Sequence, residues 1–144
     1  MSDKNKAVAR AVFDVFNGAD PSELDDVVAA DAIDHDPYNP YREEGREGLK
    51  KAVAMYRQAF PDLQMSIEDQ IAEGDKVVTR WVATGTHEGE LMGTPPTGKS
   101  SKVTGIGIDR IENGQVVEAW GNWDTLGMFQ QLGLAGEPAA AAQT

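Results

Sequence analysis

The sequence predicts an α+β fold in which N-terminal helices pack on one face of a curved, mainly antiparallel sheet. Apolar residues recur with helical spacing before Pro61 and with a period of two after it. Two short joins, at residues 73–75 and 112–114, separate stretches rich in β-branched and aromatic residues. The second join contains Asn113-Gly114, which is typical of tight hairpins, so the strands should be antiparallel neighbours. Helices followed by strands indicate the α+β class.

Three helices are expected before Pro61. The first covers about residues 5–17, because its apolar residues share one face: Val8, Ala11, Val12, Val15 and Phe16. The second covers about residues 20–30, since Asp20, Pro21 and Glu23 follow the order of N-cap, first-turn proline and capping acid. Residues 34–41 contain two prolines and should form an irregular connection. The third helix covers about residues 46–60 and stops before the proline.

Four strands are expected after Pro61, as a strongly curved meander. They cover about residues 63–68, 76–87, 102–111 and 115–124, and a short helix follows over 125–132. A chain of 144 residues suits one hydrophobic core, so we predict a single domain over residues 1–134. Residues 135–144 have almost no large apolar side chain and are expected to form a disordered tail.

The charge balance and the lack of cysteine exclude several classes of function. Thirteen Lys and Arg residues stand against 24 Asp and Glu, which gives a formal net charge of -11. Such an acidic surface repels phosphate backbones and anionic lipids, so neither nucleic acid nor membrane is an expected partner. Without cysteine there are no disulfides, thiolate nucleophiles or thiolate metal sites. We expect a cytoplasmic protein, since no leader-like or membrane-spanning apolar run occurs.

One segment matches the phosphate-binding loop pattern G-x-x-x-x-G-K-[ST] by its letters. It runs from Gly93 to Ser100, but Pro95 and Pro96 remove two of the N–H donors that would hold a phosphate. The residues that follow form a predicted strand, whereas the motif requires a helix there. We therefore interpret the segment as a proline-rich loop and exclude nucleotide hydrolysis.

The last predicted strand holds the strongest candidate for acid/base chemistry. If its even-numbered face looks into the hollow between sheet and helices, Asp124 lies there beside Trp120 and Asn122. A partly apolar setting raises the pKa of a carboxyl toward the range useful for proton transfer. An Asp before a helical run is equally typical of an N-cap, and the two roles can coexist.

Three further polar residues are candidates for the same pocket. His35 and His87 are the only histidines, and either could polarise a carbonyl or simply be a satisfied polar residue. They show no tight metal-binding spacing, so no metal is expected. Arg80 lies among apolar strand residues, where it either pairs with an acid or binds an anion or carbonyl. Three tryptophans and other aromatics would favour a flat apolar ligand.

Several segments together resemble the SnoaL-like polyketide cyclases, or ester cyclases, of the NTF2-like superfamily. The resemblance covers about residues 5–134 and rests on these motifs: Asp75 to Trp81, Gly85 to Gly89, Gly93 to Lys99, Asp109 to Gly114, Glu118 to Asp124 and Gln130 to Gly133. It implies a cone-shaped α+β barrel that encloses an apolar pocket. It also implies a homodimer or homotetramer that associates through the sheet.

The resemblance implies a cofactor-free intramolecular aldol ring closure of an aromatic polyketide ester. Asp124, at the end of the W-x-x-x-D arrangement, would be the acid/base, and His87 would donate to the developing enolate oxygen. The side chains expected to bind a small apolar or aromatic carbonyl substrate are His35, Arg80, Trp81, Trp120, Asn122, Tyr56 and Phe16. The alternatives are an isomerase or hydrolase acting on another small apolar substrate, or a non-catalytic ligand-binding module.

Overall fold

The computed structural model describes residues 2–136 and confirms the α+β class. Within this range it has four α-helices and five strands: α1 (Ser2–Phe16), α2 (Leu24–Val27), β1 (Val28–Asp34), α3 (Gly45–Ala59), β2 (Gln64–Glu73), β3 (Lys76–Thr86), β4 (Ser100–Glu112), β5 (Gln115–Trp123) and α4 (Thr125–Gln131). Short 3₁₀ turns cover Pro21–Glu23 and Arg42–Glu44. The predicted tail lies, from residue 137 onward, outside the described residues.

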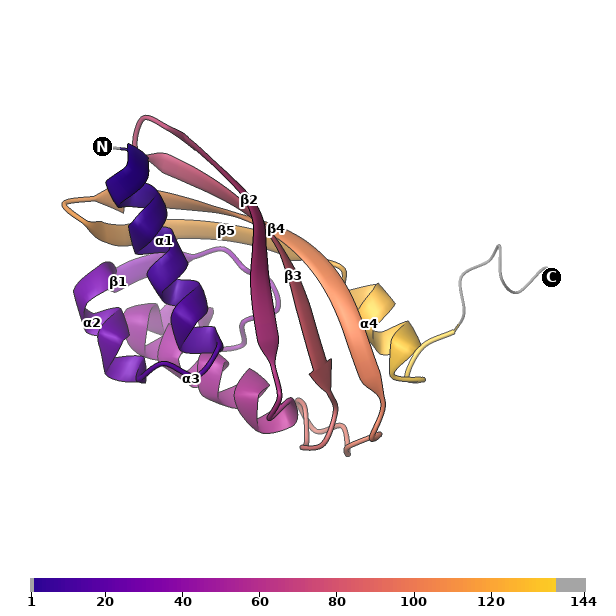
Figure 1. Cartoon of the computed structure of the whole chain (residues 1–144). Helices are drawn as coiled ribbons and strands as arrows, with labels where there is room; N and C mark the ends of the chain where they lie inside the picture. Colours follow the sequence, from indigo (N-terminus) through magenta and orange to yellow (C-terminus); the bar gives the residue numbers. More distant parts are fainter. Residues whose placement is uncertain (1, 137–144) are drawn as a thin grey trace.

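The strands form one mixed sheet in the order β1-β5-β4-β3-β2. Strands β2 to β5 are antiparallel neighbours, as predicted, and β1 runs parallel to β5. The sheet is strongly curved but open, with β1 and β2 as its two edges (Figure 1). The cone-shaped barrel that the resemblance implies is thus an open one, in which the helices and the curved sheet together surround an interior.

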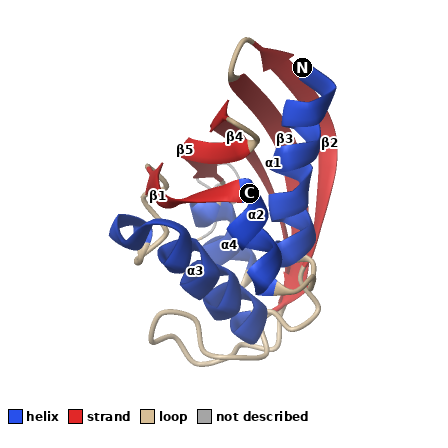
Figure 2. Ribbon diagram, turned by 90° about the vertical axis from the view of Figure 1, so that its left-hand side faces the viewer, coloured by secondary structure: helices blue, strands red, loops and turns tan. Residues whose placement is uncertain are grey.

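The helices cover one face of the sheet, which we call the inner face. Helix α1 contacts β2 and β3, while α3 contacts β1 (Figure 2). One apolar cluster joins the first three helices to the inner face: Ala9, Val15, Leu24, Val28, Val53, Val77, Ile111 and Val116. A second cluster joins the end of α3 to β3, β4 and α4: Ala59, Phe60, Ala83, Leu91, Val103, Met128 and Leu132.

Strand β1 was not predicted, because a helix was expected up to about residue 30. The helix start signals are correct, since Asp20 accepts a hydrogen bond from the backbone N–H of Ser22 at 2.9 Å. Helix α2 nevertheless ends at Val27, and the chain turns into a strand that pairs with the edge of β5. Satisfying that edge is a tertiary requirement, which overrides the local helical pattern.

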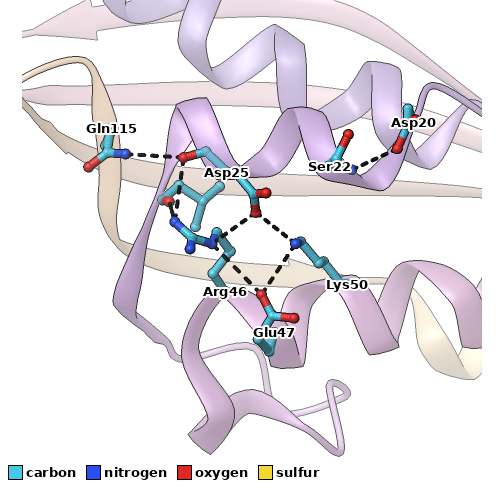
Figure 3. Close-up of polar contacts among 8 residues, drawn as sticks. Asp20, Ser22, Asp25, Arg46, Glu47, Lys50 and Gln115 are labelled. Atoms are coloured by element: carbon cyan, nitrogen blue, oxygen red, sulfur yellow. Dashed lines mark hydrogen bonds and ion pairs between the residues drawn. The ribbon is translucent and has the colours of Figure 1, made fainter.

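A polar cluster fixes the turn from α2 into β1 (Figure 3). Arg46, in the first turn of α3, donates from Nη1 to the backbone oxygens of Asp25 and Val28 at 3.4 and 3.1 Å. Lys50 Nζ lies 2.7 Å from Asp25 Oδ1 and 3.3 Å from Glu47 Oε2. Exposed ion pairs contribute little to stability. The main effect of Arg46 is therefore to satisfy carbonyls at the end of α2, where β1 begins.

The loop between β3 and β4 contains the segment that matches the phosphate-loop pattern. Strand β4 begins at Ser100, the last residue of that segment, so no helix follows it. The structure thus confirms the interpretation as a loop between antiparallel strands. Between residues 2 and 136, no helix is long and apolar enough to span a membrane.

Candidate active site

A cavity of about 220 Å³ lies between the inner face of the sheet and the helices. Its wall is mainly apolar and aromatic, and it comes from α1, α3, α4 and all five strands. The aromatic members are Phe13, Phe16, Tyr56, Phe60, Trp81, Trp120 and Trp123. Four of the residues predicted to bind substrate are thereby brought together in one wall: Phe16, Tyr56, Trp81 and Trp120.

Glycines on the inner face leave room for this cavity. Gly105 of β4 lies opposite Trp123 of β5, and Gly107 lies opposite Gly121. The indole of Trp81 lies over Gly105 so closely that a Cβ there would be 2.2 Å from Trp81 Cζ2. Only glycine permits that approach, because real Cβ contacts do not occur at such distances. On this face the wide indole of Trp81 thus packs next to glycines that have no side chain, and this arrangement leaves space between the sheet and the helices.

A β-bulge decides which side chains of β5 face the cavity. Ile111 of β4 pairs with Val116, whereas the preceding residue, Arg110, pairs with Glu118, so Val117 is an extra residue. A bulge of this kind reverses the alternation of side chains along the strand. Beyond it, the side chains on the cavity side are those of the odd-numbered residues Ala119, Gly121 and Trp123. Trp120 also borders the cavity, although its ring stacks on His35. The expectation that the even-numbered face looks inward is therefore wrong beyond the bulge.

Two carboxyls flank Ala119 on the cavity wall. Asp34 of β1 and Asp109 of β4 both pair with Ala119, because β5 lies between their strands. Side chains of directly paired residues point to the same face, and both carboxyls line the cavity. Burial raises the pKa of Asp109 to about 7, and the negative charge of Asp34 adds to that rise. Asp109 is thus part protonated and part ionised near neutral pH.

A third carboxyl, that of Asp36, lines the cavity just beyond the end of β1. Burial raises its pKa, although a hydrogen bond from the Tyr38 amide opposes the shift. Burial also raises the pKa of Tyr56, so its hydroxyl stays protonated, and it donates to the Tyr38 backbone oxygen at 3.1 Å. This region of the wall therefore combines an acid, a hydroxyl donor and the indole of Trp123, which packs edge-on against Tyr56.

Asp124 lies outside this cavity wall. It is exposed, and its Oδ1 accepts a hydrogen bond from the backbone N–H of Gly127 at 2.9 Å, as the N-cap of α4. The partly apolar setting expected for it is therefore not found, because the bulge turns the even-numbered residues of β5 away from the interior. The acid/base role predicted for Asp124 stays a prediction.

His87 is fully buried but is also absent from the cavity wall. Its Nδ1 accepts a hydrogen bond from the backbone N–H of Thr97 at 3.2 Å, and its ring lies 5.5 Å from that of Phe60. Since Nδ1 accepts, the proton of a neutral ring is on Nε2, which has no hydrogen-bond partner among the described residues. The hydrogen bond between His87 and Thr97 therefore joins the two ends of the loop between β3 and β4.

The other predicted polar residues lie on the outer face of the sheet or at its rim. His35 Nε2 lies 2.7 Å from Glu118 Oε2, and the His35 ring stacks on Trp120 at 5.2 Å. Arg80 and Asn122 are exposed, and each pairs with Ile106 of β4. None of His35, Arg80 and Asn122 is among the residues that line the cavity.

Sequence reasoning missed the carboxyls that the fold places on the wall. Asp109 follows Gly105 and Gly107 at a spacing of two. One face of β4 therefore carries two glycines and then an aspartate, with Val103 before them and Ile111 after them. That pattern could have indicated an acid facing a hollow. Between residues 2 and 136, no group of three or more His, Asp or Glu side chains is arranged to hold a metal ion.

Comparison with known proteins agrees with this architecture. The model of a family described as SnoaL-like polyketide cyclase matches residues 6–132, which is most of the chain. The chain belongs to the SnoaL-like polyketide cyclase family. No match is found among curated proteins.

Solved structures of similar proteins include several from this family. IdmH of Streptomyces antibioticus, a proposed polyketide cyclase, is 33% identical with a TM-score of 0.77 over 90% of this chain and 98% of its own. A proposed polyketide cyclase of Acidithiobacillus ferrooxidans is 32% identical with a TM-score of 0.80, over 94% and 99%. AclR of Streptomyces galilaeus, a proposed hydroxylase, is 27% identical with a TM-score of 0.83, over 99% and 94%.

Proposed function

We propose that this SnoaL-like protein closes a ring in an aromatic polyketide ester by cofactor-free intramolecular aldol condensation. The observation that carries the proposal is the part-buried carboxyl of Asp109 in the wall of an aromatic cavity, with its pKa raised to about 7. A carboxyl with such a pKa can both accept and return a proton at neutral pH. The family and the similar structures named polyketide cyclases support the same class of chemistry.

In the proposed reaction Asp109 is the acid/base. Its ionised form removes a proton from a carbon between two carbonyls, which leaves an enolate. The enolate carbon then attacks a second carbonyl of the same molecule, so that one carbon–carbon bond forms and that carbonyl becomes an alkoxide. Asp109 returns its proton to the alkoxide, and the carboxylate is regenerated without any other reactant.

Hydroxyl groups in the wall are suited to stabilise the enolate oxygen. Ser101 is a buried hydroxyl that lines the cavity. Tyr56 keeps its proton because burial raises its pKa, and its hydroxyl would have to turn from the Tyr38 backbone oxygen to donate to the substrate. Loss of one donor to an oxyanion typically costs about 3 kcal/mol of transition-state stabilisation. The surrounding aromatic side chains would hold the substrate folded, which brings its two reacting carbons together.

Solvent deuterium exchange at the acidic carbon of aromatic β-keto esters tests the proposal, because it reports enolate formation even without the natural substrate. We expect Asp109→Asn to lower the exchange rate by about 10²- to 10⁴-fold, since it removes a general base. Asp124→Asn is the matched control, because Asp124 is exposed and caps α4. His87→Gln is a second control that should leave exchange unchanged in folded protein.

The reverse outcome would restore the role predicted from the sequence. If Asp124→Asn abolishes exchange and Asp109→Asn does not, Asp124 is the acid/base and the proposal for Asp109 is wrong. If all variants and the wild type bind an aromatic ester without exchange, the chain is a ligand-binding module. Exchange without ring closure would favour an isomerase or hydrolase, and the similarity to AclR shows that relatives carry other proposed activities.

A further inference from the structure

Among the described residues, Asp34 is the one carboxyl in the cavity wall that is held by two hydrogen bonds. Asn39 Nδ2 donates to its Oδ2 at 2.8 Å, and the backbone N–H of Asp36 donates to its Oδ1 at 2.8 Å. Asn39 itself is only 2% exposed, and its Oδ1 accepts from the backbone N–H of Tyr41. These contacts fix the position of the Asp34 carboxylate.

Asp109 has no comparable support. It lies on the far side of Ala119 from Asp34, about two strand spacings away, and no hydrogen bond to its carboxyl is found within residues 2–136. A carboxyl in a part-buried site near another carboxylate keeps its proton more readily, because the neighbouring negative charge opposes its ionisation. For Asp109 that neighbouring charge is Asp34.

We propose that Asp34 is a positioning residue, whose anchored carboxylate lies beside Asp109 on the cavity wall and helps to keep a proton on Asp109. This inference rests on the proposed function, in which Asp109 exchanges that proton with the substrate. Asp34 would not itself touch the reacting carbon. Its charge would add to the effect of burial and so raise the pH at which Asp109 changes from acid to base.

The other charged groups around the cavity do not compete for this role. The titratable residues in its wall are Asp34, Asp36, Asp109 and Tyr56, and the described residues that line it include no Lys, Arg or His. The α1 side contributes only apolar residues, namely Val12, Phe13 and Phe16. Asp36 carries the same sign of charge as Asp34, but only Asp34 contributes appreciably to the raised pKa of Asp109.

The test is a carbon-13 NMR titration of the Asp109 carboxyl, with Asp109→Asn used to assign the signal. We expect a midpoint at about 7 in the wild type and a shift to lower pH in Asp34→Asn. Asp31→Asn is the matched control, because Asp31 is an exposed carboxylate on the same strand and should leave the midpoint unchanged. Asp34→Ser is a second variant that can still accept from the Asp36 amide, in case the asparagine variant does not fold.

An unchanged Asp109 midpoint in the folded Asp34 variants would overturn the proposal. So would an equal shift in Asp31→Asn, since the effect would then be one of overall charge. The pH profile of deuterium exchange gives a second readout, which we expect to move to lower pH together with the NMR midpoint. If the midpoint moves but no variant alters exchange, the placement of the proton stands and the proposed function fails.

Discussion

Asp109 and Glu118 lie on neighbouring strands, β4 and β5, and face opposite sides of the sheet. On the inner face, burial raises the pKa of Asp109 to about 7. On the outer face, a hydrogen bond from His35 lowers the pKa of Glu118, and Arg110, with its Nε at 3.1 Å, lowers it further. A carboxyl on the inner face is therefore able to exchange a proton near neutral pH, whereas a carboxyl on the outer face stays ionised. The difference arises from solvent and partners, which the fold supplies.

The largest expected effect is that of Asp109→Asn on the free energy of unfolding. It tests whether the carboxyl on the inner face makes stability fall as pH rises. Because the folded-state pKa of Asp109 lies above its unfolded value of 3.8, the stability it contributes is present below about pH 4 and is lost as pH rises through about 7. The full loss amounts to about 4 kcal/mol, of which about 3 kcal/mol falls between pH 5 and pH 8. We expect Asp109→Asn to abolish it, as measured by urea unfolding at pH 5 and pH 8. A variant with the same pH dependence as the wild type would contradict this.

Gly105→Ala should be the next largest effect, because it acts on the packing of the inner face alone. Its Cβ would collide with the Trp81 indole, and such overpacking costs about 1 to 3 kcal/mol. Gly107→Ala is the control, since its Cβ would meet only the Trp120 backbone oxygen, at 3.4 Å. Thermal unfolding of the two variants measures the difference. If both variants lose the same amount of stability, the packing of the Trp81 indole does not depend on a glycine at position 105.

The outer face gives a prediction about association rather than stability. The expected homodimer or homotetramer would use this face, where Ile71 and Ile106 are 60% and 50% exposed. Ile106→Lys should then yield monomers in sedimentation velocity while the unfolding temperature of the monomer changes little. Leu126→Lys, at an exposed position on α4, is the control. A wild type that is already monomeric would end this expectation.

The smallest expected effect is that of Glu118→Gln, which tests the paired carboxyl. Its folded-state pKa lies below the unfolded value of 4.5, so the stability it contributes is present at neutral pH and is lost as pH falls through the folded-state pKa. The variant should therefore be slightly less stable at pH 7 and equal to the wild type in strong acid. The dependence of stability on pH that Glu118 contributes is thus opposite in sign to that of Asp109. Chemical unfolding of both variants at pH 7 and in strong acid measures the two dependences. If both have the same sign, the contrast between the two faces of the sheet is wrong.

Local signals were sufficient to predict much of the fold. Helix α3 ends at Ala59, just before Pro61, and the β4–β5 turn has positive φ at both Asn113 and Gly114, as an Asn-Gly hairpin requires. These features depend on residues that are neighbours in the chain. Strand β1 depends instead on the unpaired edge of β5, so no pattern within residues 28–34 could reveal it.

The candidate site was predicted in part for the same reason. Trp81 and Tyr56 lie on elements whose periodicity shows which face is apolar, and both line the cavity. The position of Asp124 depended on the alternation along β5, and the bulge at Val117 changed that alternation. Asp109 becomes a candidate only when burial and the neighbouring charge of Asp34 are known, and both are properties of the folded chain.

The extra residue at Val117 lets the length of one strand change without a change in the contents of the cavity. Deletion of that single codon would restore strict alternation while every pairing beyond it is kept, so Ala119, Gly121 and Trp123 would stay on the inner side. The scaffold and its helices would not need to change for this deletion. The bulge is therefore a position where descendants of one gene could lose or regain three nucleotides and still present the same groups to the cavity.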